Sequence, residues 1–277
     1  MANEIKKSSL YIVATPIGNL SDLSERALKT LREVDFVAAE DTRVSGLLLN
    51  HFGIKKPIVN YFEHNKRAAG EKILSELSAG KSCALVTDAG TPGISDPGTE
   101  LCRDARKSGF SVIPIPGPSA VITALSASGF PSRRFIFEGF LPQDGEKKEV
   151  LDSLLHEKRT VVFYEAPHRL KKTLSELYDA LGDRALCLAR ELTKLNEDFF
   201  DTTLSAAIAH YEQNEPRGEY VLILAGAEET EEVFWKALSI GEHVEFYKNQ
   251  GLSKMDAIKQ CAKDRGVAKN AIYKELL

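Results

Sequence analysis

The sequence has few cysteines, no long apolar run and no apolar segment near its start that resembles a signal peptide. The four cysteines among 277 residues are Cys83, Cys102, Cys187 and Cys261, and no two of them form a CxxC pair. Scattered thiols of this kind indicate a reducing compartment, not a disulfide framework or a zinc site. Because a membrane-spanning stretch and a leader are also missing, we expect a soluble, cytoplasmic protein.

The common phosphate-binding and hydrolytic motifs are missing as well. The first apolar run is followed by Ala14-Thr15-Pro16-Ile17-Gly18-Asn19, where a standard dinucleotide fold would have GxGxxG. No GxxxxGK[ST], HExxH or GxSxG occurs, which argues against a P-loop NTPase, a zinc protease and a serine hydrolase. The six histidines are isolated, so we expect no metal site.

Positive charge is not in excess. The formal net charge is −4, which argues against a chain covered by nucleic acid and leaves room only for a local basic surface. A hydrophobic content of 43% and a charged content of 27% are ordinary for a globular protein. The length allows two medium domains with cores of their own.

The most informative segment present is the loop at 88–98, which lies between an apolar run and a helical pattern. Its eleven residues include three glycines, two prolines and two aspartates. Glycine lets a backbone approach a ligand closely, and proline stiffens the path of the chain. Open α/β sheets bind ligands in loops of this type. We interpret the 88–98 loop as the wall of a small-molecule pocket, although a long surface loop would have a similar composition.

Strand and helix patterns alternate along most of the chain. Strand patterns at 9–14, 35–39, 57–61, 82–87 and 111–115 alternate with helical patterns at 21–34, 66–77 and 99–107 and with two that end at 49 and 128. We expect Ser21 or Asp22 to cap the first helix. A second set has strands at 134–140, 160–164, 185–189, 198–203 and 218–224, with helices at 147–156 and from Pro167. The order predicts an α/β fold with a mostly parallel N-terminal sheet and, because 198–203 suits an antiparallel strand, a mixed C-terminal sheet.

The composition changes near residue 227. Residues 228–245 hold six acidic side chains and one lysine, whereas residues 248–274 hold seven basic and two acidic ones. Two short helices at 253–265 and 267–276, separated by Gly266, have the character of a helix-turn-helix. A solvated helical cap without nucleic-acid contact is the other reading. We therefore predict an N-terminal α/β domain (1–118), a C-terminal α/β domain (119–226) and a small helical domain (227–277).

Four strand ends carry structured segments. They are 15–18, 88–98, 116–120 and 163–169, and parallel strands would bring such ends to one edge of a sheet. Together with 39–43, 189–194 and 218–220, these segments resemble the tetrapyrrole-methylase superfamily of S-adenosylmethionine-dependent methyltransferases. Within it, Glu40-Asp41-Thr42-Arg43 and Glu165-Ala166-Pro167-His168-Arg169 resemble the branch that 2′-O-methylates a cytidine of 16S rRNA in the decoding-centre region. The resemblance extends from about residue 10 to 226.

The resemblance implies S-adenosylmethionine as cofactor and assigns a set of binding residues. Asp88 would serve the ammonium or the ribose, Ser119 and Ala120 the carboxylate, and Tyr164 the adenine. Phe163 would flank the adenine too, although it suits the core equally well. The implied set is Pro16, Asp88, Gly90, Thr91, Pro92, Gly93, Ile94, Ser119, Ala120, Phe163, Tyr164, Gly218 and Tyr220.

The implied reaction is attack of a ribose 2′-hydroxyl on the sulfonium methyl. A general base would help because a hydroxyl is a poor nucleophile, and Glu165 and His168 are the candidates. Asp41 and Glu191 are further carboxylates near the site, but salt bridges to neighbouring arginines are the more probable role for them.

The resemblance also implies 16S rRNA or the small ribosomal subunit as partner, no membrane, and a homodimer. Positive charge for RNA phosphates would come from Arg43, Arg169, Arg190 and Lys194. Two alternatives stay open: methylation of a tetrapyrrole or another small molecule, and a non-catalytic RNA-binding protein on the same scaffold. The basic tail and the arginines argue against the first, and the 88–98 loop against the second.

Overall fold

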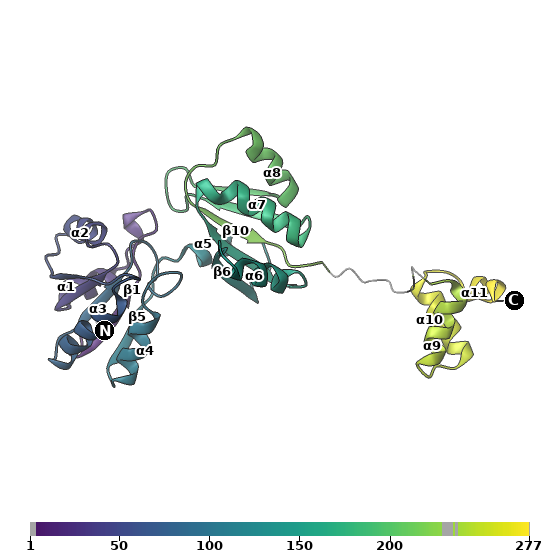
Figure 1. Cartoon of the computed structure of the whole chain (residues 1–277), viewed down its shortest axis with the longest axis horizontal. Helices are drawn as coiled ribbons and strands as arrows, with labels where there is room; N and C mark the ends of the chain where they lie inside the picture. Colours follow the sequence, from purple (N-terminus) through teal and green to yellow (C-terminus); the bar gives the residue numbers. More distant parts are fainter. Residues whose placement is uncertain (1–3, 229–234, 236–237, 277) are drawn as a thin grey trace. The chain divides into compact units, whose positions relative to one another are not determined.

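The computed structural model describes residues 4–228, 235 and 238–276. Contacts divide the chain into two compact units, Met1–Ala227 and Glu228–Leu277. The larger unit holds two five-stranded sheets, and the smaller one is helical (Figure 1). The division of the larger unit into domains at 118 stays a prediction. No helix in the described residues is long and apolar enough to cross a membrane.

The first sheet is entirely parallel, as the alternation of strands and helices predicts. It consists of β1 (Ser9–Val13), β2 (Phe36–Ala39), β3 (Ile58–Asn60), β4 (Cys83–Val86) and β5 (Ser111–Ile115), in the order β3-β2-β4-β1-β5. Every residue of β2 and β4 is buried. Strands covered on both faces have no solvent side, which is why these segments lack polar alternation in the sequence.

Four helices cover this sheet. They are α1 (Glu25–Glu33), α2 (Thr42–His51), α3 (Lys66–Ser78) and α4 (Thr99–Lys107). One buried cluster joins Leu31 of α1 and Leu49 of α2 to Val37, and another joins Ile73 of α3 and Leu101 of α4 to the opposite face of the strands. The predicted cap of α1 was wrong: Ser24 is the cap and accepts a hydrogen bond from the Ala27 N–H, because residues 20–22 form a separate 3₁₀ turn.

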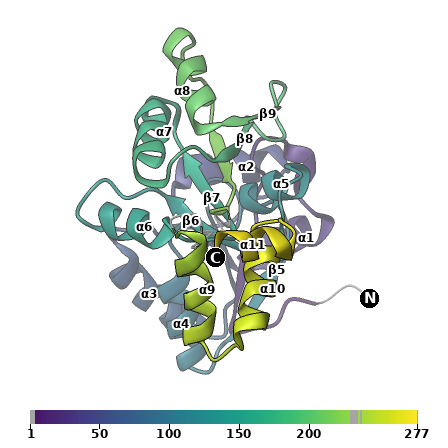
Figure 2. The same cartoon turned by 90° about the vertical axis from the view of Figure 1, so that its right-hand side faces the viewer.

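The second sheet is mixed, as predicted. It contains β6 (Phe135–Phe140), β7 (Thr160–Glu165), β8 (Ala185–Arg190), β9 (Asp198–Thr203) and β10 (Tyr220–Leu224), in the order β6-β7-β10-β8-β9. Only β6 and β7 pair in parallel, and β9 is antiparallel to β8. The helices of this half are α5 (Ala120–Ala127), α6 (Glu146–Leu154), α7 (Pro167–Leu181) and α8 (Leu204–Gln213). Figure 2 shows the elements from a second direction.

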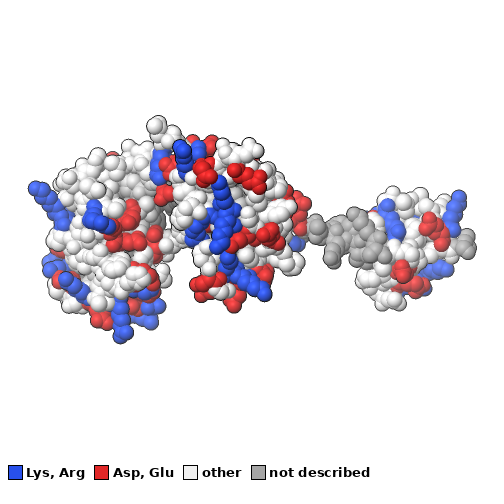
Figure 3. Space-filling view, turned by 45° about the horizontal axis from the view of Figure 1, so that its top comes forward, with Lys and Arg blue, Asp and Glu red and all other residues white. Residues whose placement is uncertain are grey.

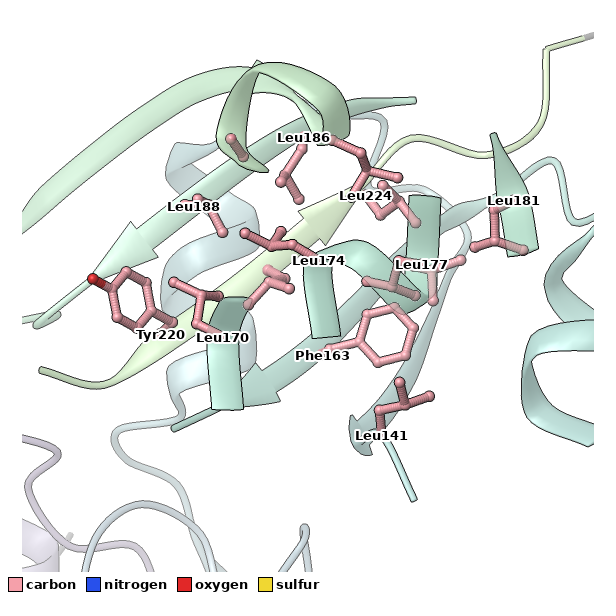
Figure 4. Packing of buried hydrophobic residues seen from close by; sticks show 14 of the residues in the cluster. Leu141, Phe163, Leu170, Leu174, Leu177, Leu181, Leu186, Leu188, Tyr220 and Leu224 are labelled. Carbon is pink, nitrogen blue, oxygen red and sulfur yellow. The ribbon is translucent and has the colours of Figure 1, made fainter. Parts of the chain in front are cut away.

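The core of the second sheet is built on leucines of α7. Leu170, Leu174 and Leu177 are fully buried and pack against Phe163 of β7 (Figure 4). Because side chains alternate along a strand, the neighbours Val162 and Tyr164 point to the opposite face, where α5 packs. Burying an aromatic ring among leucines removes a large apolar area from water and stabilises this half of the unit.

Two glycines lie where loops of the two sheets meet. A Cβ added to Gly18, after β1, would lie 2.6 Å from Lys194 Cγ, and one added to Gly139, in β6, would lie 2.6 Å from Ser95 Oγ. Gly139 also has a positive φ of +67° at a shift in the β6–β7 register. The first approach brings the segment after β1 against the segment after β8, and the second brings the 88–98 loop against β6.

The small unit contains α9 (Ile240–Asn249), α10 (Lys254–Asp264) and α11 (Lys269–Glu275) around Val244, Ile258 and Ile272. The two predicted tail helices correspond to α10 and α11. The acidic segment of the sequence falls partly on 229–234 and 236–237, which lie outside the described residues. Burial and the nearby Arg265 guanidinium lower the pKa of His243 inside this unit.

Gly139→Ala tests whether the close approach to Ser95 positions the loop. We expect it to lower the free energy of unfolding by about 1–3 kcal/mol, since alanine is strained at positive φ. Gly145→Ala is the control, because Gly145 has a φ of −60° and open space around its Cβ position. Urea denaturation of both variants measures the difference. Equal stability of the two would contradict the assignment.

Candidate functional site

A pocket of about 360 Å³ lies where the strand ends of both sheets meet. All four segments selected from the sequence reach its wall: Ile17 after β1, the 88–98 loop after β4, Ser119 after β5 and Glu165 at the end of β7. The lining consists of Ile17, Glu40, Asp88, Ala89, Gly90, Thr91, Ile94, Ser95, Asp96, Ser119, Ala120, Phe140, Tyr164, Glu165, Ala166, Leu192, Glu219, Tyr220 and Val221.

Backbone hydrogen bonds fix the 88–98 loop on two sides. The Thr15 N–H donates to the Gly90 carbonyl at 2.8 Å, and the Gly90 N–H donates back to Thr15 at 3.1 Å. Gly90 has a φ of +89°, which glycine adopts without strain. On the other side, the Thr91 hydroxyl donates to the Pro118 carbonyl at 3.0 Å. The loop is therefore held between the ends of β1 and β5.

Three carboxylates, from Glu40, Asp88 and Asp96, line the first-sheet side of the pocket. The Thr87 hydroxyl, at the end of β4, donates to Glu40 Oε2 at 2.9 Å and also lies within hydrogen-bonding reach of Asp96. Asp88 Oδ1 accepts the backbone N–H of Asp41 at 3.1 Å. Because β2 and β4 are neighbours in the sheet, Glu40 and Asp88 follow adjacent strands and lie at the same edge.

The pKa of Asp96 is strongly raised by its surroundings. Burial, above all, together with the negative charges of Glu40 and Asp88, raises its pKa to about 7, although the Thr87 hydrogen bond acts in the opposite direction. Asp96 therefore gains or loses its proton near neutral pH. The state of this one group decides how negative the pocket is.

Among the described residues that line the pocket there is no lysine, arginine or histidine. The two other acidic side chains of the lining, Glu165 and Glu219, are each paired with a cation outside it. Arg169 Nε lies 3.2 Å from Glu165, and Lys194 Nζ donates to Glu219 at 2.8 Å. Glu40, Asp88 and Asp96 form no ion pair within the described part of the chain, although Arg43 lies near enough to Asp88 to interact with its charge. The pocket consequently favours a positively charged ligand.

The N-terminus of α5 forms the opposite wall. Its cap residue, Ser119, makes no side-chain hydrogen bond to the helix, and Ala120 lines the pocket. The Tyr164 hydroxyl accepts the Val121 N–H at 3.0 Å, which fixes the tyrosine ring beside this helix start. Backbone N–H groups at a helix N-terminus are a favourable place for an anionic group.

Eight of the thirteen residues expected to bind a cofactor line this pocket: Asp88, Gly90, Thr91, Ile94, Ser119, Ala120, Tyr164 and Tyr220. Pro16, Pro92, Gly93, Phe163 and Gly218 lie outside the lining. Phe163 is fully buried in the leucine core. Gly218 has a φ of +80°, and an added Cβ would lie 2.4 Å from Glu191 Cγ, so it permits a close turn of the chain. The binding roles of the whole set stay predictions.

The two candidate bases occupy different places. Glu165 lies in the pocket wall, but its side chain is inaccessible to solvent and accepts hydrogen bonds from two donors, the Ala166 N–H and the Thr173 hydroxyl. Arg169 Nε lies 3.2 Å from it as an ion-pair partner without a hydrogen bond. His168 is exposed in the first turn of α7 and does not line the pocket.

The other two carboxylates considered as bases are in ion pairs. Asp41 accepts from Arg43 at 2.6 Å, an interaction that lowers its pKa to about 2, and Glu191 accepts from Lys194 at 2.9 Å.

The four cations expected to contact RNA differ in exposure. The Arg43 side chain is 88% exposed, whereas Arg169, Arg190 and Lys194 are about one-quarter to one-third exposed and lie beside carboxylates. On the face drawn in Figure 3, basic side chains gather in one narrow stripe flanked by acidic ones, so the positive surface of the described residues is local there and not broad.

Sequence reasoning missed Glu40 and Asp96 as site residues. Glu40 directly follows β2, so the strand-end rule that selected the other segments applied to it equally. Asp96 belongs to the 88–98 loop, but its raised pKa depends partly on the negative charges of Glu40 and Asp88. Those side chains lie beside it because β2 and β4 are neighbours in the sheet, which the sequence does not show.

Comparison with known proteins gives one consistent family. A family model described as Tetrapyrrole (Corrin/Porphyrin) Methylases matches residues 9–208. A protein of Halalkalibacterium halodurans is 49% identical over 96% of this chain and 94% of its own length, and one of Bacillus subtilis is 46% identical over 95% and 92%. Both are named ribosomal RNA small subunit methyltransferase I.

A relative of the same name in Thermotoga maritima is 48% identical over 99% of its length but only 79% of this chain. Among solved structures, a cobalt precorrin-4 methyltransferase of cobalamin biosynthesis has a TM-score of 0.60 at 20% identity, covering 79% of this chain and 95% of its own. That likeness concerns the fold. The family match and the relatives together establish that the chain belongs to the tetrapyrrole methylase family, with the proteins named ribosomal RNA small subunit methyltransferase I as its relatives.

Proposed function

We propose that this protein is an S-adenosylmethionine-dependent methyltransferase that methylates the 2′-hydroxyl of a cytidine ribose in 16S rRNA, in the decoding-centre region. The names of its relatives support an rRNA substrate, and the family supports the methyl donor. The cytidine, the 2′ position and the region are the finer part of the proposal, and rest on the resemblance of the 40–43 and 165–169 segments.

The observation that carries the cofactor assignment is the charge of the pocket. Three carboxylates without an ion-pair partner among the described residues face a cavity whose described lining holds no basic side chain. S-adenosylmethionine has a sulfonium and an ammonium group, and both are attracted by such a lining. A dinucleotide or a nucleoside triphosphate would be repelled. The chemistry of the donor set therefore suits this cofactor.

Different walls of the pocket would bind different parts of the cofactor. The uncapped N-terminus of α5 would hold the methionine carboxylate through the backbone around Ala120. Tyr164, with its hydroxyl fixed by Val121, would offer a ring face to the adenine. Asp88, already bonded to the Asp41 N–H, retains acceptor capacity for the ribose or the ammonium. When bound, the cofactor supplies an electrophilic methyl group on its sulfonium.

The protein must also take up the proton released by the attacking hydroxyl. Asp96 has a pKa close to 7, which suits a group that accepts a proton at physiological pH. The Thr87 hydroxyl, which donates to Glu40, also lies within reach of Asp96 and so joins the two side chains at one point of the wall. Glu165 instead holds the start of α7 in place, because its oxygens are occupied by the N–H of the cap residue Ala166 and by the hydroxyl of Thr173 in the second turn. We therefore assign the proton-accepting role to Asp96, ahead of Glu165 and His168.

Ala120→Asp tests the carboxylate site at α5. The new side chain would compete for the N–H groups of the helix start and repel the methionine carboxylate, so we expect cofactor affinity to fall at least about tenfold. The control is Ala206→Asp, which places the same side chain in the first turn of α8, outside the pocket. Calorimetric titration with S-adenosylmethionine measures both. Unchanged affinity in Ala120→Asp would remove α5 from the site.

The pH dependence of cofactor binding tests Asp96. Because its pKa is raised to about 7, a cation binds the ionised form better, and affinity should rise between pH 6 and pH 8. Binding near pH 6.5 should release a proton, which calorimetry in buffers of different ionisation enthalpy detects. Asp96→Asn should abolish both effects, and Asp152→Asn, in an exposed position on α6, should abolish neither.

The same group has a predictable effect on stability. The folded protein retains a proton on Asp96 between about pH 4 and pH 7 that the unfolded chain has lost, so stability without cofactor falls as pH rises through this window. Asp96→Asn should raise the thermal midpoint at pH 8 relative to the wild type. A lowered midpoint would mean that the surroundings of Asp96 do not disfavour its ionised form.

Methyl transfer to RNA tests the function itself. Purified protein, labelled S-adenosylmethionine and small subunits or 16S rRNA from cells lacking the protein should give label in RNA. Because a 2′-O-methyl group blocks alkaline cleavage of the adjoining phosphodiester, the label should appear in an alkali-resistant dinucleotide that begins with cytidine. Label in an alkali-sensitive nucleotide would refute the 2′ position, and absence of label would refute the rRNA substrate.

A further inference from the structure

A second cavity, which we call the Arg217 pocket, lies at one edge of the second sheet. It has a volume of about 460 Å³ and is formed by the end of β8, the starts of β9 and β10, and the C-terminal half of α8 with the loop that follows. Its lining consists of Leu188, Arg190, Asp198, Phe200, His210, Tyr211, Asn214, Glu215, Arg217 and Tyr220. None of the functions assigned above uses this cavity as a whole.

Strand register places the Arg217 pocket next to the cofactor pocket. Tyr220 pairs with Glu165 of β7 on one side and with Arg190 of β8 on the other, and Arg190 pairs with Asp198 of β9. Neighbouring strands are about 4.8 Å apart, so Arg190 lies on the order of 10 Å from Glu165 along this edge. Tyr220 lines both cavities. A polymer that enters the cofactor pocket at this edge therefore passes the Arg217 pocket.

The second cavity differs from the first in that its lining holds two arginines, Arg190 and Arg217, beside two carboxylates, Asp198 and Glu215. Arg190 approaches Asp198 only to 3.6 Å, and its buried Nε has no hydrogen-bond partner in the described part of the chain. Arg217 is exposed, and its guanidinium makes no ion pair or hydrogen bond with any described residue. Glu215 forms an ion pair with Lys171 at 2.8 Å and not with either arginine of the pocket. Two guanidinium groups with spare donors suit a phosphate.

An aromatic surface stands beside these guanidiniums. The rings of Phe200 and His210 are 5.0 Å apart with a tilt of 50°, and His210 also meets Tyr211 edge-on at 4.8 Å. Phe200 is partly buried against the leucine core, which holds its ring in place, whereas His210 is exposed. Aromatic faces next to arginines are what proteins use to bind unpaired bases of single-stranded RNA.

We propose that the Arg217 pocket binds a nucleotide of the substrate RNA adjacent to the methylated one, with Arg190 and Arg217 on its phosphate and Phe200 and His210 against its base. This site rests on the proposed RNA substrate and gives that substrate a second point of attachment. The Arg217 pocket would hold the RNA strand so that the target ribose reaches the cofactor pocket. Binding there requires that the base of the adjacent nucleotide is unstacked from its neighbours.

Two variants test the pocket, each with a matched control. Arg217→Ala removes a side chain that nothing in the described structure depends on, and Phe200→Leu removes the ring but keeps an apolar side chain in the core. Each should raise the KM for RNA about tenfold, by loss of a charged contact or of a stacked base, while the calorimetric affinity for S-adenosylmethionine stays unchanged. The control for Arg217→Ala is Arg67→Ala, at an exposed arginine of α3. The control for Phe200→Leu is Phe62→Leu, because Phe62 also lies beside a histidine. Both controls should leave the KM for RNA and the affinity for S-adenosylmethionine unchanged.

A substrate change identifies the nucleotide concerned. A set of small-subunit RNAs would be ligated from synthetic segments. Each RNA would carry a single abasic site, at a different position flanking the target nucleotide. At one position the missing base should raise the KM of the wild type about tenfold and have little further effect in Phe200→Leu, because the two changes remove the same contact.

The possible outcomes separate this site from the proposed function. If the wild type methylates RNA and both pocket variants keep the wild-type KM, the Arg217 pocket is refuted and the function stands. If the abasic effect is as large in Phe200→Leu as in the wild type at every position, the pocket does not contact a base. If the wild type transfers no methyl group to RNA, the proposed function fails, and this site fails with it.

Discussion

The pair of backbone hydrogen bonds between Thr15 and Gly90 is the constraint on which the site depends. It ties the 88–98 loop to the end of β1, and the Thr91 hydroxyl ties the same loop to Pro118. A loop free to move would separate Asp88 and Asp96 from Glu40, since like charges repel. Held on both sides, the loop keeps the carboxylates together, and the pKa of Asp96 is raised as a result. The energy stored in this arrangement is what a cationic ligand releases.

The second sheet contributes a wall to the pocket through its strand ends. Glu165, Tyr220 and Arg190 stand in register across three neighbouring strands, so one edge of the sheet carries a carboxylate held inside the protein, an aromatic ring and a guanidinium in turn. Figure 4 shows Tyr220 at the border of the leucine core with its hydroxyl directed away from it. The packed core under α7 therefore fixes the spacing between the acidic pocket and the Arg217 pocket.

Much of the fold was predictable from local patterns, and part of the site was not. The strands and the parallel first sheet follow from apolar runs and their alternation with helices. Helix α9 was missed although Ser239 and Glu242 form a capping box, a signal present in the sequence. At the end of β7, periodicity shows that Phe163 and Tyr164 face opposite ways, but not which of them faces the pocket. That choice, like the pKa of Asp96, depends on strand order, which places β2 beside β4 and is not contained in any local segment.

The lack of basic side chains among the described residues of the cofactor pocket has a consequence for turnover. Under the proposed function, methyl transfer would convert the sulfonium of the cofactor into a neutral thioether, so the ligand would lose a positive charge while Glu40 and Asp88 still line the pocket. The attraction between the lining and the ligand would then be weaker for the spent cofactor than for the methyl donor. The same lining that favours binding of the donor would thus favour release of the product.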